Sequence, residues 1–264
     1  MITPGKAKRL NRIFRADGRT VVVPMDHGVT GGPMHGLVDM QGIVNKLLVG
    51  SVDAVILNKG IAGRMDTGQA GLIVHLSAST KIGPDLLRKT RVCSVEEALR
   101  IGADGVSVHI NVGAETEPEM LTKLGVVADE CDAYGVPLLA MMYPRGPKIQ
   151  SEHAPDVVAH AARLGAELGA DIIKTNYTGS IETFRDVIRG CPVPVIIAGG
   201  PKAETTKEVL EMTYNSLQAG GKGVSIGRNV FQHENPTAMV KALSAVIHEN
   251  ATMEKALTIL GETR

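Results

Sequence analysis

Lys174 is the side chain whose surroundings most favour chemistry, because it lies between Ile173 and Thr175 at the end of an apolar run. An ammonium removed from water has a lowered pKa, and its free amine attacks a ketone to form a Schiff base. A structural lysine that reaches solvent or pairs with Asp171 would fit the same pattern. Tyr143, which ends the preceding apolar run, favours catalysis, because its hydroxyl can move the proton of imine formation and carbon–carbon cleavage. Otherwise Tyr143 is a rim tyrosine with a hydrated hydroxyl.

Asp26 ends an earlier apolar run and is followed by His27 and a glycine-rich loop. A carboxylate that faces a cationic iminium would stabilise it or accept a hydroxyl proton. Asp26 could instead form an Asx-type turn into the loop. Gly28, Gly31 and Gly32 would let a ligand approach the backbone closely.

Two short motifs near the carboxyl end of the chain favour a phosphate site. Gly199 and Gly200 follow one apolar run, and Gly227 and Arg228 follow the next. In a (β/α)8 barrel, these two loops commonly bind phosphate through backbone N–H groups, and an arginine can add a forked contact. Arg145 would hold another part of the substrate, unless it is a surface arginine.

Three histidines raise the question of a metal ion. His75 and His109 fall on neighbouring apolar runs, and His27 could supply a third ligand. Such residues are more often hydrogen-bonded interior histidines, and we favour that interpretation. We therefore expect no metal site.

Eight short apolar runs alternate with segments of helical period, which predicts parallel strands with crossover helices, closed into a (β/α)8 TIM barrel. The predicted strands lie near residues 20–26, 53–58, 72–77, 105–110, 137–142, 171–175, 194–198 and 223–227. The predicted helices lie near 39–49, 94–102, 117–134, 154–169, 181–189, 203–219 and 236–248.

Two segments depart from this alternation. The glycine-rich stretch 59–70 predicts a shortened second crossover. A further helix from about residue 250 lies beyond the eight units, and we expect it to cap the barrel or contact a neighbouring chain. No flexible linker interrupts the sequence, so residues 1–264 are predicted to form a single domain.

Composition excludes several classes of protein. The chain has 28 basic and 28 acidic residues, so no net charge attracts nucleic acid or an anionic membrane surface. Its three cysteines are widely spaced, which argues against a disulfide framework or structural zinc and favours the reducing cytoplasm. No run of about 20 apolar residues predicts a membrane span.

The motifs MDHGVTGGP, MMYPRG, IKTNY, AGGP and GRNVFQ occur in this order over residues 25–232. Together they resemble the archaeal-type class I aldolases. The fructose-bisphosphate aldolases of that family tend to carry DHGxxHGP and a Trp two residues before the Tyr, where this chain has Gly31 and Met141. The sequence is more similar to the family's synthases of archaeal aromatic amino acid biosynthesis, on the route to 3-dehydroquinate.

The resemblance implies that Lys174 forms the Schiff base, that Tyr143 is the proton donor and that Asp26 is the proton acceptor. The substrate contacts it implies are Asp26, His27, Gly28, Val29, Thr30, Tyr143, Pro144, Arg145, Gly199, Gly200, Gly227 and Arg228.

The implied reaction is a transaldolase-type transfer of a three-carbon ketol unit from 6-deoxy-5-ketofructose 1-phosphate to L-aspartate 4-semialdehyde. It requires no metal or organic cofactor, and family members form decamers of paired pentameric rings. Two alternatives remain open: a class I fructose-1,6-bisphosphate aldolase, and a non-catalytic phosphosugar-binding protein.

Overall fold

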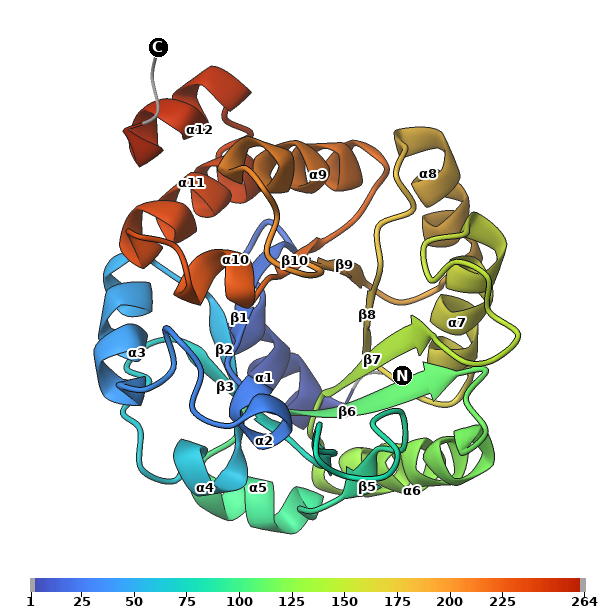
Figure 1. The fold of residues 1–264 in the computed structure, drawn as a ribbon. Coiled ribbons are helices and arrows are strands. Elements are labelled where there is room, and N and C mark those ends of the chain that lie inside the picture. Colours follow the sequence, from blue (N-terminus) through green and yellow to red (C-terminus); the bar gives the residue numbers. More distant parts are fainter. Residues whose placement is uncertain (1–2, 262–264) are drawn as a thin grey trace.

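A closed barrel of eight parallel strands forms the centre of the computed structural model, which describes residues 3–261 (Figure 1). Around the barrel, each strand pairs with the next, and β1 pairs with β10 to close it. The barrel strands are β1 (Thr20–Pro24), β2 (Ala54–Asn58), β3 (Gly71–His75), β6 (Gly105–Val112), β7 (Leu138–Pro144), β8 (Ile172–Thr175), β9 (Val195–Ala198) and β10 (Gly223–Ser225). The predicted (β/α)8 barrel is therefore confirmed.

Helices surround the barrel and bury the outward-facing side chains of the strands (Figure 1). The long helices of this ring are α3 (Met40–Val49), α5 (Val95–Ile101), α6 (Glu117–Tyr134), α7 (Pro155–Glu167), α8 (Ile181–Gly190), α9 (Thr206–Gln218) and α11 (Pro236–His248). The second crossover is the single turn α4 (Lys59–Ala62), which confirms the predicted shortening. None of the helices within residues 3–261 is both long and apolar enough to span a bilayer.

A separate apolar cluster fills the barrel interior, with Ile56, Ile73 and Ile196 among its fully buried members. Because side chains alternate along a strand, Ile172 and Lys174 share the inner face of β8 while Ile173 packs outward. Apolar side chains therefore fill the barrel interior, and polar side chains lie at the carboxyl ends of the strands.

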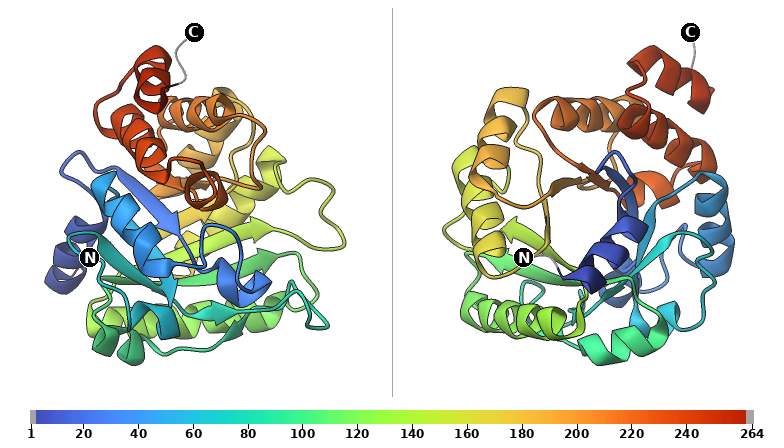
Figure 2. Two further views of the ribbon diagram at one scale, coloured as in Figure 1. Left: turned by 60° about the vertical axis from the view of Figure 1, so that its left-hand side comes forward. Right: turned by 180° about the vertical axis from the view of Figure 1, so that it is seen from behind.

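An N-terminal helix that the sequence analysis did not predict, α1 (Pro4–Ile13), closes the amino end of the barrel (Figure 2). Aspartates at the start of three strands accept hydrogen bonds from the backbone of the neighbouring strands. Cations on or just after α1 pair with the same carboxylates. The pairs are Lys6 with Asp171, Arg12 with Asp104, and Arg15 with Asp53.

The C-terminal helix α12 (Met253–Leu260) packs outside the ring, against α9 and α11 (Figure 1). The expectation that this helix caps the barrel is therefore wrong, because α1 occupies that position. Whether α12 contacts a second chain stays a prediction.

Candidate active site

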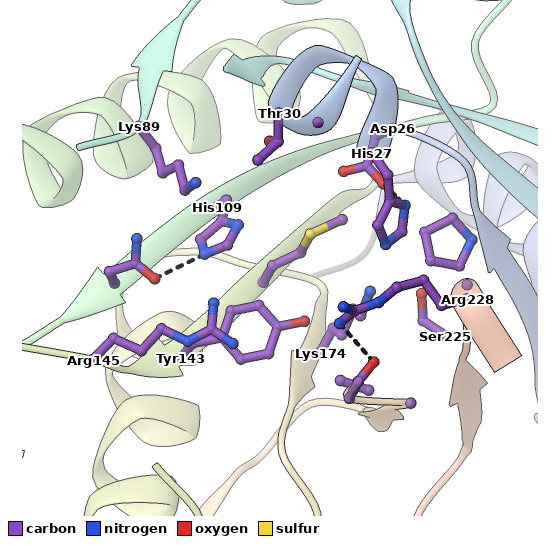
Figure 3. Close-up of a pocket in the computed structure, with 18 of the residues that line it drawn as sticks. Asp26, His27, Thr30, Lys89, His109, Tyr143, Arg145, Lys174, Ser225 and Arg228 are labelled. Atoms are coloured by element: carbon purple, nitrogen blue, oxygen red, sulfur yellow. Dashed lines mark hydrogen bonds and ion pairs between the residues drawn. The ribbon is translucent and has the colours of Figure 1, made fainter. Parts of the chain in front are cut away.

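A pocket lies at the carboxyl ends of the barrel strands, where the strand endings converge (Figure 3). Most of the predicted site residues line it: Asp26, His27, Thr30, Tyr143, Arg145, Lys174, Gly199, Gly200, Gly227 and Arg228. Gly28, Val29 and Pro144 do not form part of its wall. Gly28 and Val29 belong to the short helix α2 (His27–Gly31) and are exposed to solvent, so their contact with substrate stays a prediction.

Lys174 projects from β8 into the barrel, beside Met141 of β7, and is only 5% exposed. Within residues 3–261, no carboxylate lies at ion-pairing distance from its amine. Asp171 lies at the opposite end of β8 and binds Lys6 instead, so the alternative of a Lys174–Asp171 pair is wrong. Burial, opposed by Asp26, lowers the pKa of Lys174 to about 8, so roughly a tenth of the amine is unprotonated at pH 7, far more than for an exposed lysine.

Tyr143 also points inward, and its hydroxyl is directed towards the centre of the pocket, on the side of Lys174 (Figure 3). Its ring packs against His109, with centroids 5.0 Å apart, and the Arg145 guanidinium lies 4.5 Å from the ring centroid. Tyr143 is 6% exposed, which disfavours a hydrated rim tyrosine. Burial raises the pKa of Tyr143, so the phenol stays protonated and can donate a proton.

Asp26 follows β1, and its carboxylate faces two histidines: His27 Nδ1 at 3.6 Å and His75 Nε2 at 3.7 Å. Its side chain makes no capping hydrogen bond to α2, which argues against a turn-forming role. Burial alone would raise the pKa of Asp26, but His75, His27 and Lys174 together lower it. Because burial also lowers the pKa of His75 to about 4, that ring is neutral near neutral pH, and protonated Lys174 is the main cation facing Asp26 there.

Two of the three histidines are hydrogen-bonded, as we expected, whereas His27 Nδ1 is buried without a hydrogen-bond partner among the described residues. His75 Nδ1 lies 2.8 Å from Ser107 Oγ, and His109 Nε2 lies 2.9 Å from Asn111 Oδ1. Across the described residues, no group of three His, Cys, Asp or Glu side chains is placed to hold a metal ion.

The loops after β9 and β10 form one polar end of the pocket. Arg228, at the start of α10 (Arg228–Phe231), donates a hydrogen bond from Nη2 to Gly200 O at 2.9 Å. A Cβ at Gly227 would lie 2.7 Å from His27 Cε1, so this close approach requires glycine. Ser225 Oγ and Arg228 Nε are buried and have no hydrogen-bond partner among the described residues. Free donors at this position suit an anionic ligand.

Ser225 and a second group of cations also line the pocket, although neither was predicted from the sequence. Ser225 ends a strand of only three residues. The available signal in the sequence was its alternation with Val224, which packs outward. The strands β4 (Ser77–Ala78) and β5 (Thr90–Arg91) form a hairpin that brings Lys81 and Lys89 to the pocket. Because these strands have two residues each, the hairpin has no recognisable period-two pattern.

Comparisons with known proteins agree with this geometry. The chain is 48% identical, over 99% of its length and 98% of the relative, to a 2-amino-3,7-dideoxy-D-threo-hept-6-ulosonate synthase of Halobacterium salinarum. It is 43% identical, over 94% of its length and 92% of the relative, to a 2-amino-4,5-dihydroxy-6-oxo-7-(phosphonooxy)heptanoate synthase of Streptomyces griseus.

Among solved structures, a Schiff-base-forming fructose-1,6-bisphosphate aldolase superposes with a TM-score of 0.87. It is 32% identical to this chain, and the match covers 92% of this chain and 100% of the aldolase. Residues 20–233, nearly the whole barrel, match the DeoC/LacD aldolases. The chain belongs to the DeoC/LacD family of aldolases.

Proposed function

We propose that this enzyme is a 2-amino-3,7-dideoxy-D-threo-hept-6-ulosonate synthase. It transfers a three-carbon ketol unit from 6-deoxy-5-ketofructose 1-phosphate to L-aspartate 4-semialdehyde, in archaeal aromatic amino acid biosynthesis. The observation that carries the chemistry is a buried lysine amine without an ion-pair partner in the described chain, facing a pocket that also contains Tyr143 and Asp26.

The proposed steps follow from these three groups. The Lys174 amine adds to the ketone and water leaves, which gives an iminium that draws electrons from the adjacent carbons. Asp26 accepts the proton of the hydroxyl β to the iminium carbon, and the carbon–carbon bond breaks. The hydroxyl-bearing fragment leaves as the aldehyde of a dioxopropyl phosphate, and the bonding electrons form an enamine on Lys174. The enamine carbon then attacks the acceptor aldehyde, and Tyr143 protonates the new alkoxide. Water finally hydrolyses the iminium and releases the seven-carbon product.

Two positions favour the synthase over a fructose-bisphosphate aldolase. A Cβ at Gly31 would lie 2.9 Å from Met34 Cε, so glycine here lets the end of the Met34 side chain lie beside the pocket. Met141 lies next to Lys174 in the β7–β8 register. These thioether side chains present apolar surface to the substrate, which suits a methyl ketone better than a hydroxyl-rich sugar.

The phosphate is proposed to bind the loops after β9 and β10. Backbone N–H groups of Gly199 and Gly200 and the Arg228 guanidinium are the proposed ligands, with Gly227 allowing close approach. Ser225 Oγ adds a free donor at this end of the pocket.

Mass spectrometry of the products tests the proposed reaction. We expect the seven-carbon amino keto acid from the two proposed substrates, and much slower cleavage of fructose 1,6-bisphosphate. Efficient cleavage of the bisphosphate without any seven-carbon product would establish the glycolytic-type aldolase instead. Borohydride added with the ketose should fix it to Lys174 as a secondary amine, whereas a non-catalytic binding protein would give no adduct.

A second candidate is the reaction named for the Streptomyces griseus relative, whose product retains a phosphonooxy group. The phosphate-type loops beside Lys174 are compatible with a phosphorylated three-carbon donor. The mass of the product separates the two synthases, because only one product contains phosphorus.

The assembly and cellular location complete the proposal. We infer a single-domain chain that forms a homo-oligomer, a decamer by resemblance, without nucleic acid or membrane partners. Cys93, Cys131 and Cys191 are buried free thiols, which is consistent with the reducing cytoplasm. Sedimentation of the purified protein should give about ten times the 27.9 kDa mass of one chain.

A further inference from the structure

We propose that the β4–β5 hairpin supplies a subsite for the carboxylate of the acceptor aldehyde, with Lys89 as its main ligand and Lys81 beside it. This inference rests on the proposed function, in which the acceptor is an amino acid semialdehyde. It identifies the residues that would select an acceptor carrying a carboxylate.

The hairpin is a fixed part of the pocket wall. It reaches over the pocket between α2 and β6, and its backbone is bonded to three different elements. The bonds run from Asn111 Nδ2 to Leu87 O at 2.6 Å, from Lys123 Nζ to Lys89 O at 2.7 Å, and from Lys81 N to Thr30 O at 3.0 Å.

Lys89 is half-buried and extends towards the side of the pocket that contains His109 and Thr30 (Figure 3). Its amine donates a hydrogen bond to Ser79 Oγ. In the part of the chain that the structure describes, no carboxylate lies at ion-pairing distance from this amine, whereas Arg145 is paired with Glu152 at 2.6 Å.

Burial and the nearby charge of Arg145, opposed by Asp26 and Asp85, lower the pKa of Lys89 to about 8. A bound carboxylate would compensate the Lys89 ammonium through a charge-assisted hydrogen bond.

The pocket therefore has two cationic ends, with Lys174 and Tyr143 between them (Figure 3). The end at Arg228 combines a planar guanidinium with backbone N–H groups of a Gly-Gly loop, which suits phosphate. The end at Lys89 offers flexible point charges without such a loop, which suits a smaller carboxylate. In the proposed reaction the phosphate leaves on the dioxopropyl fragment before the semialdehyde binds, so the two anions occupy the pocket in turn, and Lys89 is available to the carboxylate when it enters.

The test compares Lys89→Met, Lys81→Met and Lys89→Arg with wild-type enzyme, at saturating 6-deoxy-5-ketofructose 1-phosphate. Lys222→Met is the matched control, since this exposed lysine precedes β10 at the opposite end of the barrel. We expect Lys89→Met to raise the KM for L-aspartate 4-semialdehyde by about 10- to 100-fold, the usual effect of losing a charged hydrogen bond. Lys81→Met should raise it less, and Lys89→Arg should restore most of the affinity.

A second acceptor separates a carboxylate contact from a general defect. 3-Aminopropanal lacks the carboxylate, so its KM should be the same in Lys89→Met and wild type. The subsite is refuted if wild type and Lys89→Met have equal KM values for the semialdehyde, or if Lys89→Met raises only the KM for the phosphorylated ketose, which would place phosphate at Lys89. A wild-type enzyme that forms no seven-carbon product would refute the proposed function and the subsite together.

Discussion

At the scale of single residues, one physical effect, burial, prepares two groups for opposite tasks. Burial lowers the pKa of Lys174, which frees an amine, and raises the pKa of Tyr143, which retains a proton. Asp26, whose side chain is 17% exposed, remains a carboxylate, because its neighbours His75, His27 and Lys174 outweigh its loss of hydration. The sequence predicted these three residues because each ends an apolar run. It could not predict Lys89, whose position depends on a hairpin with no sequence pattern.

The first prediction concerns the pH dependence of Schiff-base formation. Only the unprotonated amine attacks, so the rate of borohydride trapping should rise with pH and level off above about 8, the pKa of Lys174. Asp26 opposes the lowering of this pKa, so Asp26→Asn should move the midpoint to lower pH. A rate that does not change between about pH 6 and pH 9 would contradict a titrating Lys174.

The second prediction concerns Tyr143→Phe. Loss of the phenol should reduce turnover by about 10²- to 10⁴-fold, the usual contribution of a general acid–base group, while the ketose still binds. Steady-state kinetics measures the effect. The matched control is Tyr134→Phe, which removes the hydroxyl of a half-exposed tyrosine at the end of α6. Equal turnover in the two variants would remove Tyr143 from the mechanism.

At the scale of elements, the sequence predicted all eight barrel strands and the long helices that follow them, because apolar runs mark buried parallel strands. It did not predict α1, whose buried residues are only Lys6 and Ile13. This helix is held largely by charges whose partners lie far along the chain, so no local periodicity reveals it. Its sequence does contain a local signal, since Thr3 caps the helix and Pro4 begins it.

The third prediction tests the role of α1. Lys6 is buried and pairs with Asp171, so Lys6→Met leaves that carboxylate without its main cation. We expect a loss of about 3 kcal/mol in the free energy of unfolding, as for other broken buried pairs. Thermal or chemical denaturation measures it, with Lys8→Met on the exposed side of the same helix as the control. Equal stability of the two variants would show that α1 does not depend on this pair.

At the scale of the whole molecule, charge is balanced in number but not in position. The chain has 28 basic and 28 acidic residues, whereas the described residues that line the pocket include five Lys and Arg side chains and one carboxylate. The aspartates at the opposite end of the barrel are compensated by cations of the α1 segment. A neutral protein therefore maintains a positive field where an anionic substrate enters. The barrel fold, which many enzymes share, does not by itself determine this feature.

The last prediction follows from that field. Ions screen charge interactions over about 10 Å at 0.1 M salt, so raising the salt concentration should reduce kcat/KM for the phosphorylated ketose by several-fold. Arg228→Ala should weaken binding of this substrate by about 1.5–3 kcal/mol, because it removes a charged hydrogen bond, and should also flatten the salt dependence. Arg185→Ala, which removes an exposed arginine on α8, is the control and should change neither quantity. If the Arg228 variant retains wild-type affinity and the wild-type salt dependence, the phosphate does not bind at the loops after β9 and β10.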